Sequence, residues 1–111
     1  MRVLFVCSRA RRRSLTAETV FSAETSLQVA SAGTSPEADT PTSVDLIEWA
    51  DLIFTMENHH RAKLRERYGK TLAQKPVIVL RIPDAYEYMD PELIGILRSK
   101  VDPHLRAHLS R

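Results

Sequence analysis

An apolar run near the start of the sequence is followed directly by the chain's single cysteine, a basic loop and a helical pattern. Residues 3–6 are Val-Leu-Phe-Val, a short continuous apolar run that is typical of a strand covered on both faces. Cys7 stands at the carboxyl end of this run, five residues separate it from Arg13, and Ser14 follows. Helical spacing begins at Leu15. The segment therefore predicts a strand–loop–helix unit whose loop has the form Cys-x5-Arg-Ser.

The residue types in this loop suit the binding and attack of a phosphate group. Cys7 is a nucleophile when ionised, whereas an ordinary thiol, with a pKa of about 8.5, is mostly protonated at neutral pH. A helix N-terminus, nearby guanidinium groups and the Ser14 hydroxyl would all favour the thiolate. The loop amides would surround an anion, and Arg13 would contact two phosphate oxygens with a planar fork that lysine lacks. The loop therefore predicts cysteine-based chemistry on a phosphate ester.

Strand-like runs and helical patterns alternate along the rest of the chain. The strands are expected at 3–6, 27–31, 52–56 and 77–80. Strands joined by helical crossovers pair in parallel, and their carboxyl ends meet at one edge of the sheet. Four short segments follow these strands and should gather there: Cys7, Gly33-Thr34, Glu57 and Asp84. We therefore expect one α/β domain over residues 1–111, with three layers, a four-stranded parallel sheet and an N-terminal Cys-x5-Arg phosphate-binding loop.

Capping and stop residues place the ends of the later helices. The expected signals are Thr42 or Ser43 as the cap of a short helix ending at Trp49, Asn58 and Gly69 as the two ends of the next helix, and Asp90-Pro91 as the start of the last one. A second Asp-Pro pair at 102–103 predicts that this last helix breaks or kinks near Val101.

Composition bounds the class of protein. The chain has 111 residues, 43% hydrophobic and 27% charged, as in an ordinary globular domain. No apolar run approaches the roughly 18 residues of a membrane span, and no signal-peptide pattern is visible. The single cysteine excludes an internal disulfide and a cysteine-rich zinc site, and a reactive free thiol suits a reducing cytoplasm, where we expect the protein. The net charge of +2 is too small to argue for nucleic-acid binding.

At this spacing the chain resembles the low-molecular-weight protein tyrosine phosphatase family. The Cys-x5-Arg loop lies close to the N-terminus, after a strand and before a helix, as it does in that family. Three later segments are similar in the same order: 31–34 (Ser-Ala-Gly-Thr), 50–57 (Ala-Asp-Leu-Ile-Phe-Thr-Met-Glu) and 83–86 (Pro-Asp-Ala-Tyr). The last of these is similar to the loop that holds the general acid, usually Asp-Pro-Tyr. The resemblance covers nearly the whole chain.

The resemblance implies roles for individual residues. Cys7 would be the nucleophile, Arg13 the phosphate-binding guanidinium and Asp84 the general acid. Asp90 is the alternative acid, although its position before Pro91 also explains it as a helix cap. The expected substrate-binding residues are Ser8, Arg9, Ala10, Arg11, Arg12, Ser14 and Tyr86.

The loop also departs from the family pattern. Family members usually have a Gly and an Asn inside it, and often a second cysteine before the arginine, where this chain has Arg9, Ala10, Arg11 and Arg12. We expect no metal or cofactor. The adjacent His59 and His60 lack the i, i+4 metal-binding spacing and would start a solvated helix, whereas His104 and His108 have that spacing without an evident third ligand.

The main functional hypothesis is a cysteine-dependent phosphatase that hydrolyses phosphomonoesters, in particular phosphotyrosine, through a cysteinyl-phosphate intermediate. Its partners would be phosphorylated proteins or small phosphomonoesters, with no membrane partner, and nucleic acid would be a less favoured one. Two alternatives are arsenate reduction with an external thiol, and a non-catalytic module that binds anions or RNA through the loop arginines. Tyr86 and Tyr88 would either line the mouth of the site or pack beneath a loop.

Overall fold

The computed structural model describes residues 1–109, which form four strands and four helices in alternation. The strands are β1 (Arg2–Cys7), β2 (Gln28–Gly33), β3 (Leu52–Thr55) and β4 (Val77–Val79), and the helices are α1 (Arg13–Phe21), α2 (Val44–Trp49), α3 (Asn58–Leu72) and α4 (Pro91–Leu109). All neighbouring strands are parallel, in the order β2-β1-β3-β4. The predicted four-stranded α/β fold is therefore confirmed.

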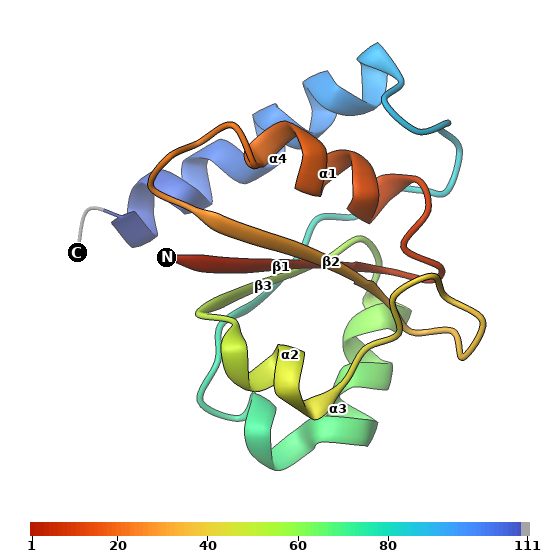
Figure 1. The fold of residues 1–111 in the computed structure, drawn as a ribbon, viewed down its shortest axis with the longest axis vertical. Coiled ribbons are helices and arrows are strands. Elements are labelled where there is room, and N and C mark those ends of the chain that lie inside the picture. The colour runs from red at the N-terminus through yellow and green to blue at the C-terminus, as the bar shows by residue number, and fades with distance from the viewer. Residues whose placement is uncertain (110–111) are drawn as a thin grey trace.

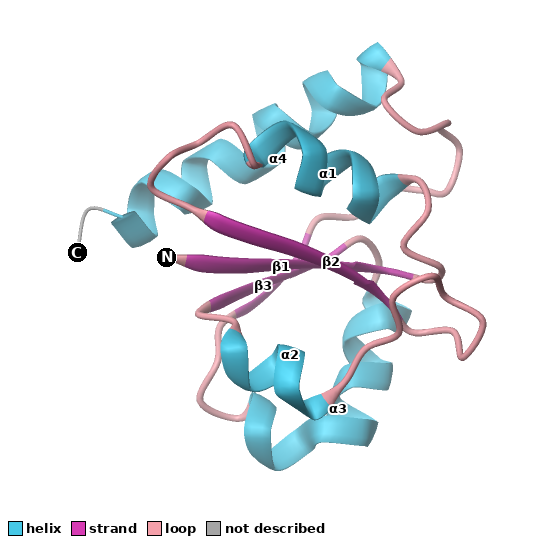
Figure 2. Ribbon diagram, in the orientation of Figure 1, coloured by secondary structure: helices cyan, strands magenta, loops and turns pink. Residues whose placement is uncertain are grey.

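Helices cover both faces of the sheet. α1 and α4 lie on one face and α2 and α3 on the other, with the sheet between them (Figure 1). The secondary-structure colouring shows the same three layers, and it shows loops gathered where β1 and β2 end (Figure 2). None of the helices in residues 1–109 combines the length and hydropathy that a membrane span requires.

The side chains of β1 alternate between two hydrophobic clusters because successive residues of a strand point to opposite faces. Val3 and Phe5 pack with α1 and α4, and the Phe5 ring stacks on both Phe21 and Phe54, with ring centroids 5.6 and 5.3 Å apart. Leu4 and Val6 pack with α2 and α3. Burial on both faces explains why this strand is a continuous apolar run, and it fixes Cys7 at the edge of the core.

Three helix boundaries differ from the predictions. The cap of α3 is Glu57 instead of Asn58, because Glu57 is extended and its N–H donates to His60 Nδ1 at 3.0 Å. Gly69 does not end α3, which passes a non-helical Tyr68 and continues to Leu72, a buried side chain of the second cluster. Ser43 caps α2 as predicted, with its Oγ accepting from Leu46 N at 3.2 Å.

The last helix is the third difference. α4 continues through Pro103 to Leu109 and does not break near Val101. Leu97, Val101 and Leu105 are all buried at a spacing of four residues, so packing against the sheet holds one helix across the proline.

Candidate active site

The loop between β1 and α1 is fixed by backbone contacts with the chain that follows β2. Cys7 pairs with Gly33 in the sheet register, and its carbonyl accepts from Thr34 N at 2.9 Å. The Ser8 carbonyl accepts from Ser35 N at 2.8 Å. A Cβ on Gly33 would lie 2.5 Å from this Ser8 oxygen, so the absence of a side chain allows the close approach. The end of β2 and the two residues after it therefore hold the start of the loop in place.

The Cys7 thiol lies at the centre of this loop with two polar neighbours. Its Sγ is 2.9 Å from Ser14 Oγ and accepts from Ala10 N at 3.2 Å. Both groups are able to donate to a thiolate, which is the geometry that a cysteine nucleophile needs. Ala10 has a φ of 59°, a left-handed conformation that costs a non-glycine residue roughly 1–2 kcal/mol. This strained turn directs the Ala10 amide towards the sulfur.

Arg13 is buried and held by three groups. Its Nη1 donates to Glu57 Oε1 at 2.5 Å and to the Ile82 carbonyl at 2.7 Å, and its Nε lies 3.8 Å from Asp84 Oδ1. The hydrogen bond from Arg13 is the largest cause that holds the pKa of Glu57 below its usual range, against the opposing effect of burial. Arg13 therefore has a fixed position, and Glu57 partly balances its charge.

The segment after β4 brings Asp84 to the site. Leu80 N and Ile82 N donate to the carbonyls of Thr55 and Met56, at 2.8 and 2.9 Å, so the chain continues beside β3 beyond the end of β4. Asp84 then stands next to Arg13 with its side chain 57% exposed. Asp90 lies instead at the start of α4, where its Oδ1 accepts from Glu92 N at 2.9 Å.

His60 is fully buried beneath the loop, which contradicts the expectation that it belongs to a solvated helix start. Burial, with a smaller contribution from the neighbouring His59, lowers the pKa of His60 to about 3, so the ring is neutral at physiological pH. Its Nδ1 accepts from Glu57 N, so the ring proton is on Nε2, which lies 3.0 Å from Ser8 Oγ. Ser8 therefore accepts from His60, and its own hydroxyl hydrogen remains available to donate to a ligand.

The burial of His60 was not predicted from the sequence. The signal for it was Glu57-x-x-His60, which has the spacing of a helix capping box and would bring the His60 ring back to the Glu57 backbone. His59 and His60 have ring centroids 4.0 Å apart, and one ligand atom each from Glu57, His59 and His60 lies within 4.8 Å of the others. Both nitrogens of His60 already have hydrogen-bond partners, so this cluster is explained by the structure without an ion.

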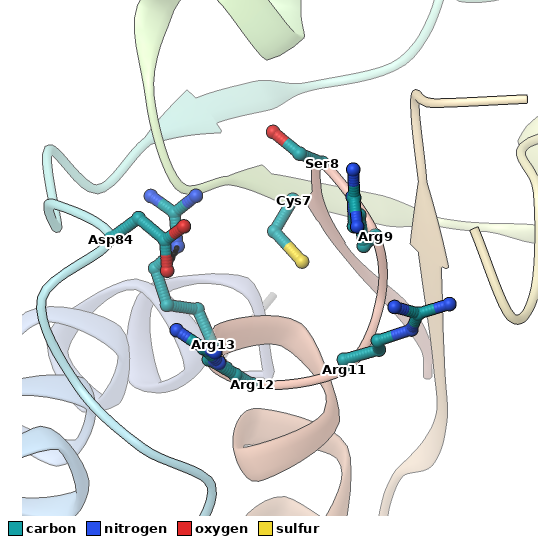
Figure 3. A pocket seen from close by; sticks show the side chains of 7 residues that line it. All are labelled: Cys7, Ser8, Arg9, Arg11, Arg12, Arg13 and Asp84. Carbon is teal, nitrogen blue, oxygen red and sulfur yellow. Dashed lines mark ion pairs between the residues drawn. The ribbon is translucent and has the colours of Figure 1, made fainter. Parts of the chain in front are cut away.

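The loop and Asp84 enclose a cavity of about 340 Å³. Its lining consists of Cys7, Ser8, Arg9, Arg11, Arg12, Arg13 and Asp84. The Cys7 sulfur points into the space between Asp84 and the loop arginines (Figure 3). The predicted nucleophile, guanidinium and acid are therefore brought together from segments nearly 80 residues apart in the chain (Cys7 to Asp84).

Tyr86 and Tyr88 are not among the residues that line this cavity. Tyr86 is partly buried and packs against the cluster between the sheet and the helices α1 and α4. Tyr88 is 47% exposed, and its hydroxyl lies 3.0 Å from Thr19 Oγ1 on α1. In this arrangement neither ring lines the cavity.

An α/β domain with a parallel sheet in this order and a Cys-x5-Arg loop after its first strand has the fold of the low-molecular-weight protein tyrosine phosphatases. Solved structures confirm it. The low-molecular-weight phosphatase SP-PTP from Streptococcus pyogenes superposes with a TM-score of 0.78 at 18% identity, over 96% of this chain and 91% of its own. A protein tyrosine phosphatase from Entamoeba histolytica gives 0.76 at 21%, over 100% and 97%. The YwlE arginine phosphatase from Geobacillus stearothermophilus gives 0.66 at 20%, over 96% of both chains.

No protein-family model and no curated protein matches the sequence. At 18–21% identity the structural likeness establishes the fold, and any activity has to follow from the residues of this chain.

Proposed function

We propose that the protein is a metal-independent phosphatase that hydrolyses phosphomonoesters through a cysteinyl-phosphate. One observation carries this proposal: a buried cysteine, hydrogen-bonded to Ser14 and the Ala10 amide, faces a cavity lined by four arginines and one exposed carboxyl group. The similar solved structures named above are phosphatases, and this likeness supports the proposal.

The first half of the reaction is a transfer of the phosphoryl group to sulfur. The Cys7 thiolate attacks phosphorus while Arg13 and the loop amides bind the other phosphate oxygens. The bond from phosphorus to the ester oxygen breaks, and Asp84 gives its proton to the departing oxygen. The Ser8 hydroxyl is placed to donate a further hydrogen bond to the phosphate.

The second half releases inorganic phosphate. Asp84, now ionised, takes a proton from a water molecule that attacks phosphorus, and the sulfur–phosphorus bond breaks. Cys7 leaves as the thiolate, which the hydrogen bonds from Ser14 and Ala10 stabilise. Asp84 is protonated again, so both groups return to their starting states.

Hydrolysis of an aryl phosphate tests the proposal. Release of inorganic phosphate from 4-nitrophenyl phosphate should proceed in the presence of a chelator and should be abolished in Cys7→Ser, because a serine hydroxyl is a far weaker nucleophile. Undiminished hydrolysis by Cys7→Ser, or loss of wild-type hydrolysis on chelation alone, would contradict the mechanism.

The two alternatives have less support. Arsenate reduction generally needs further thiols, and Cys7 is the chain's single cysteine, so an external thiol would have to complete it. A binding module without catalysis would not need a buried Cys7 held by two hydrogen-bonding groups. The proposed compartment is the cytoplasm, because a reducing environment keeps a lone nucleophilic thiol active.

Phosphotyrosine is one candidate substrate within this class, and the arginine phosphatase among the similar structures suggests phosphoarginine as another. A phosphoarginine side chain brings a guanidino group towards Arg9, Arg11 and Arg12, which is electrostatically unfavourable. We therefore favour oxygen esters.

A further inference from the structure

Three exposed arginines, Arg9, Arg11 and Arg12, form the rim of the cavity, and they indicate the class of ester that this site selects. We propose, on the basis of the phosphatase function above, that the preferred substrate is a compact phosphomonoester with a second negatively charged group close to the phosphate. The second group would be bound by the side chains of Arg9, Arg11 and Arg12.

The lining of the cavity consists of charged and polar side chains and the Cys7 thiol. Among the residues that the structure describes, none that line this cavity is aromatic: Tyr86 packs against the hydrophobic cluster, and the Tyr88 hydroxyl lies beside Thr19 of α1. An aromatic leaving group would therefore find no ring to stack on. At about 340 Å³ the cavity is near the lower end of the roughly 300–1,000 Å³ usual for small-molecule sites. Such a space suits a phosphate and a small polar group.

The four arginines of the cavity differ in burial: one is buried and three are about half exposed. Arg13 is 3% exposed in its side chain, and Glu57 and the Ile82 carbonyl hold it at the cavity that Cys7 faces. The side chains of Arg9, Arg11 and Arg12 are 55%, 47% and 53% exposed. One buried arginine serves the phosphate that reacts, so the other three cations are left for another anion.

The present partners of these three arginines are easily displaced. Arg9 lies 3.5 Å from Glu37, Arg11 lies 3.1 Å from Asp39, and Arg12 lies 3.8 Å from Glu87. The three carboxylates are themselves 59–81% exposed. Exposed pairs of this kind are weak. An anion bound between the arginines in the cavity would compete with them, because water screens it less.

A matched pair of substrates tests the proposal. 4-Carboxyphenyl phosphate and 4-carbamoylphenyl phosphate have similar size and differ in one negative charge. The carbamoyl ester has the more acidic phenol as its leaving group, so leaving-group chemistry cannot account for a preference for the carboxylate. The carboxylate should have the higher kcat/KM, by about threefold to tenfold at low salt, and the advantage should shrink at high ionic strength. A phosphotyrosyl peptide flanked by Glu, compared with its Gln counterpart, shows whether an acidic peptide also supplies the second charge.

Variants then assign the effect to the rim. Arg9→Gln, Arg11→Gln or Arg12→Gln should lower the ratio of the two kcat/KM values, whereas Glu37→Gln and Asp39→Asn should raise it by removing the competing carboxylates. Lys70→Gln is the control, because it removes the same charge from an exposed position near the far end of α3. A ratio of one in the wild type, or equal ratios in the Arg9, Arg11, Arg12 and Lys70 variants, would overturn the proposal.

Binding separates this proposal from the proposed function. Calorimetric titration of Cys7→Ser with the two aryl phosphates needs no turnover, and the carboxylate should again bind more tightly. If this preference appears without any hydrolysis by the wild type, the subsite stands and the phosphatase function fails. Hydrolysis without the preference gives the opposite conclusion.

Discussion

Two aspartates compete for the role of general acid, and their surroundings differ. Asp84 lines the cavity next to Arg13, whereas Asp90 accepts from the backbone at the start of α4. We predict that Asp84→Asn slows hydrolysis of phenyl phosphate by about 100-fold or more, because its leaving oxygen needs a proton. It should affect 4-nitrophenyl phosphate much less, because that oxygen leaves as a stable anion. Steady-state kinetics with both esters measures the difference.

Asp90→Asn is the matched control for this prediction. Asparagine also caps helices well, so the variant should lose little stability and show no dependence on the leaving group. The opposite pattern, with the dependence in Asp90→Asn alone, would transfer the acid role to Asp90.

At the scale of secondary-structure elements, the site depends on how closely β2 approaches the loop. A Cβ at Gly33 would lie 2.5 Å from both Ala38 Cβ and the Ser8 carbonyl, and 2.9 Å from the Arg9 carbonyl carbon. We predict that Gly33→Ala lowers the free energy of unfolding by about 1–3 kcal/mol and reduces kcat, because the loop backbone must shift. Urea unfolding and aryl phosphate hydrolysis measure the two effects.

Gly95→Ala provides the comparison within α4. Apart from the adjacent residues and the backbone of the helix itself, no atom lies within 4 Å of a Cβ built there, and the position is exposed inside a helix. Alanine should therefore stabilise the protein by roughly 0.5–1 kcal/mol and leave activity unchanged. If Gly33→Ala behaved like Gly95→Ala, the contact between β2 and the loop would not constrain the site.

At the scale of the whole molecule, His60 links the buried site to the pH dependence of stability. Its pKa is about 3 in the folded protein and about 6.5 when unfolded, so the unfolded chain binds more protons between these values. We predict that stability falls as pH drops below 6.5, by up to about 1.4 kcal/mol per pH unit. The lowered pKa of Glu57 adds a further loss only at more acidic pH, as that carboxylate is protonated.

Urea unfolding from pH 7 to pH 4.5 measures this slope. His60→Gln should be less stable at pH 7 and should have a shallower slope, whereas His59→Gln, at an exposed position, should keep the wild-type slope. A wild-type slope that survives in His60→Gln would assign the effect to another group.

Local patterns predicted the elements well and their ends less well. The strand at 3–6 and the caps at Ser43 and Asp90 follow from residues adjacent in sequence. Of the break or kink predicted near Val101, the break is absent, because burial of the face that contains Val101 and Leu105 outweighs a local propensity. The same reason carries α3 beyond Gly69 to the buried Leu72.

By itself, the sequence determined the β1–loop–α1 unit, with Cys7 and Arg13 at its two ends, because the distance between them is set by a few consecutive residues. It also determined the parallel sheet, through the alternation of apolar runs and helical patterns. The positions of Glu57 and Asp84 after strands also predicted that both would lie at the same edge of the sheet as this loop. Only the tertiary structure decided which atoms make contact there and that His60 is buried next to Ser8. The order of the strands and the paths of the loops bring Asp84 and Glu57 to Arg13 and bring His60 to Ser8, whereas Tyr86 packs against the hydrophobic cluster and does not line the cavity. Contacts between segments far apart in the chain depend on packing as a whole, and no local pattern encodes them.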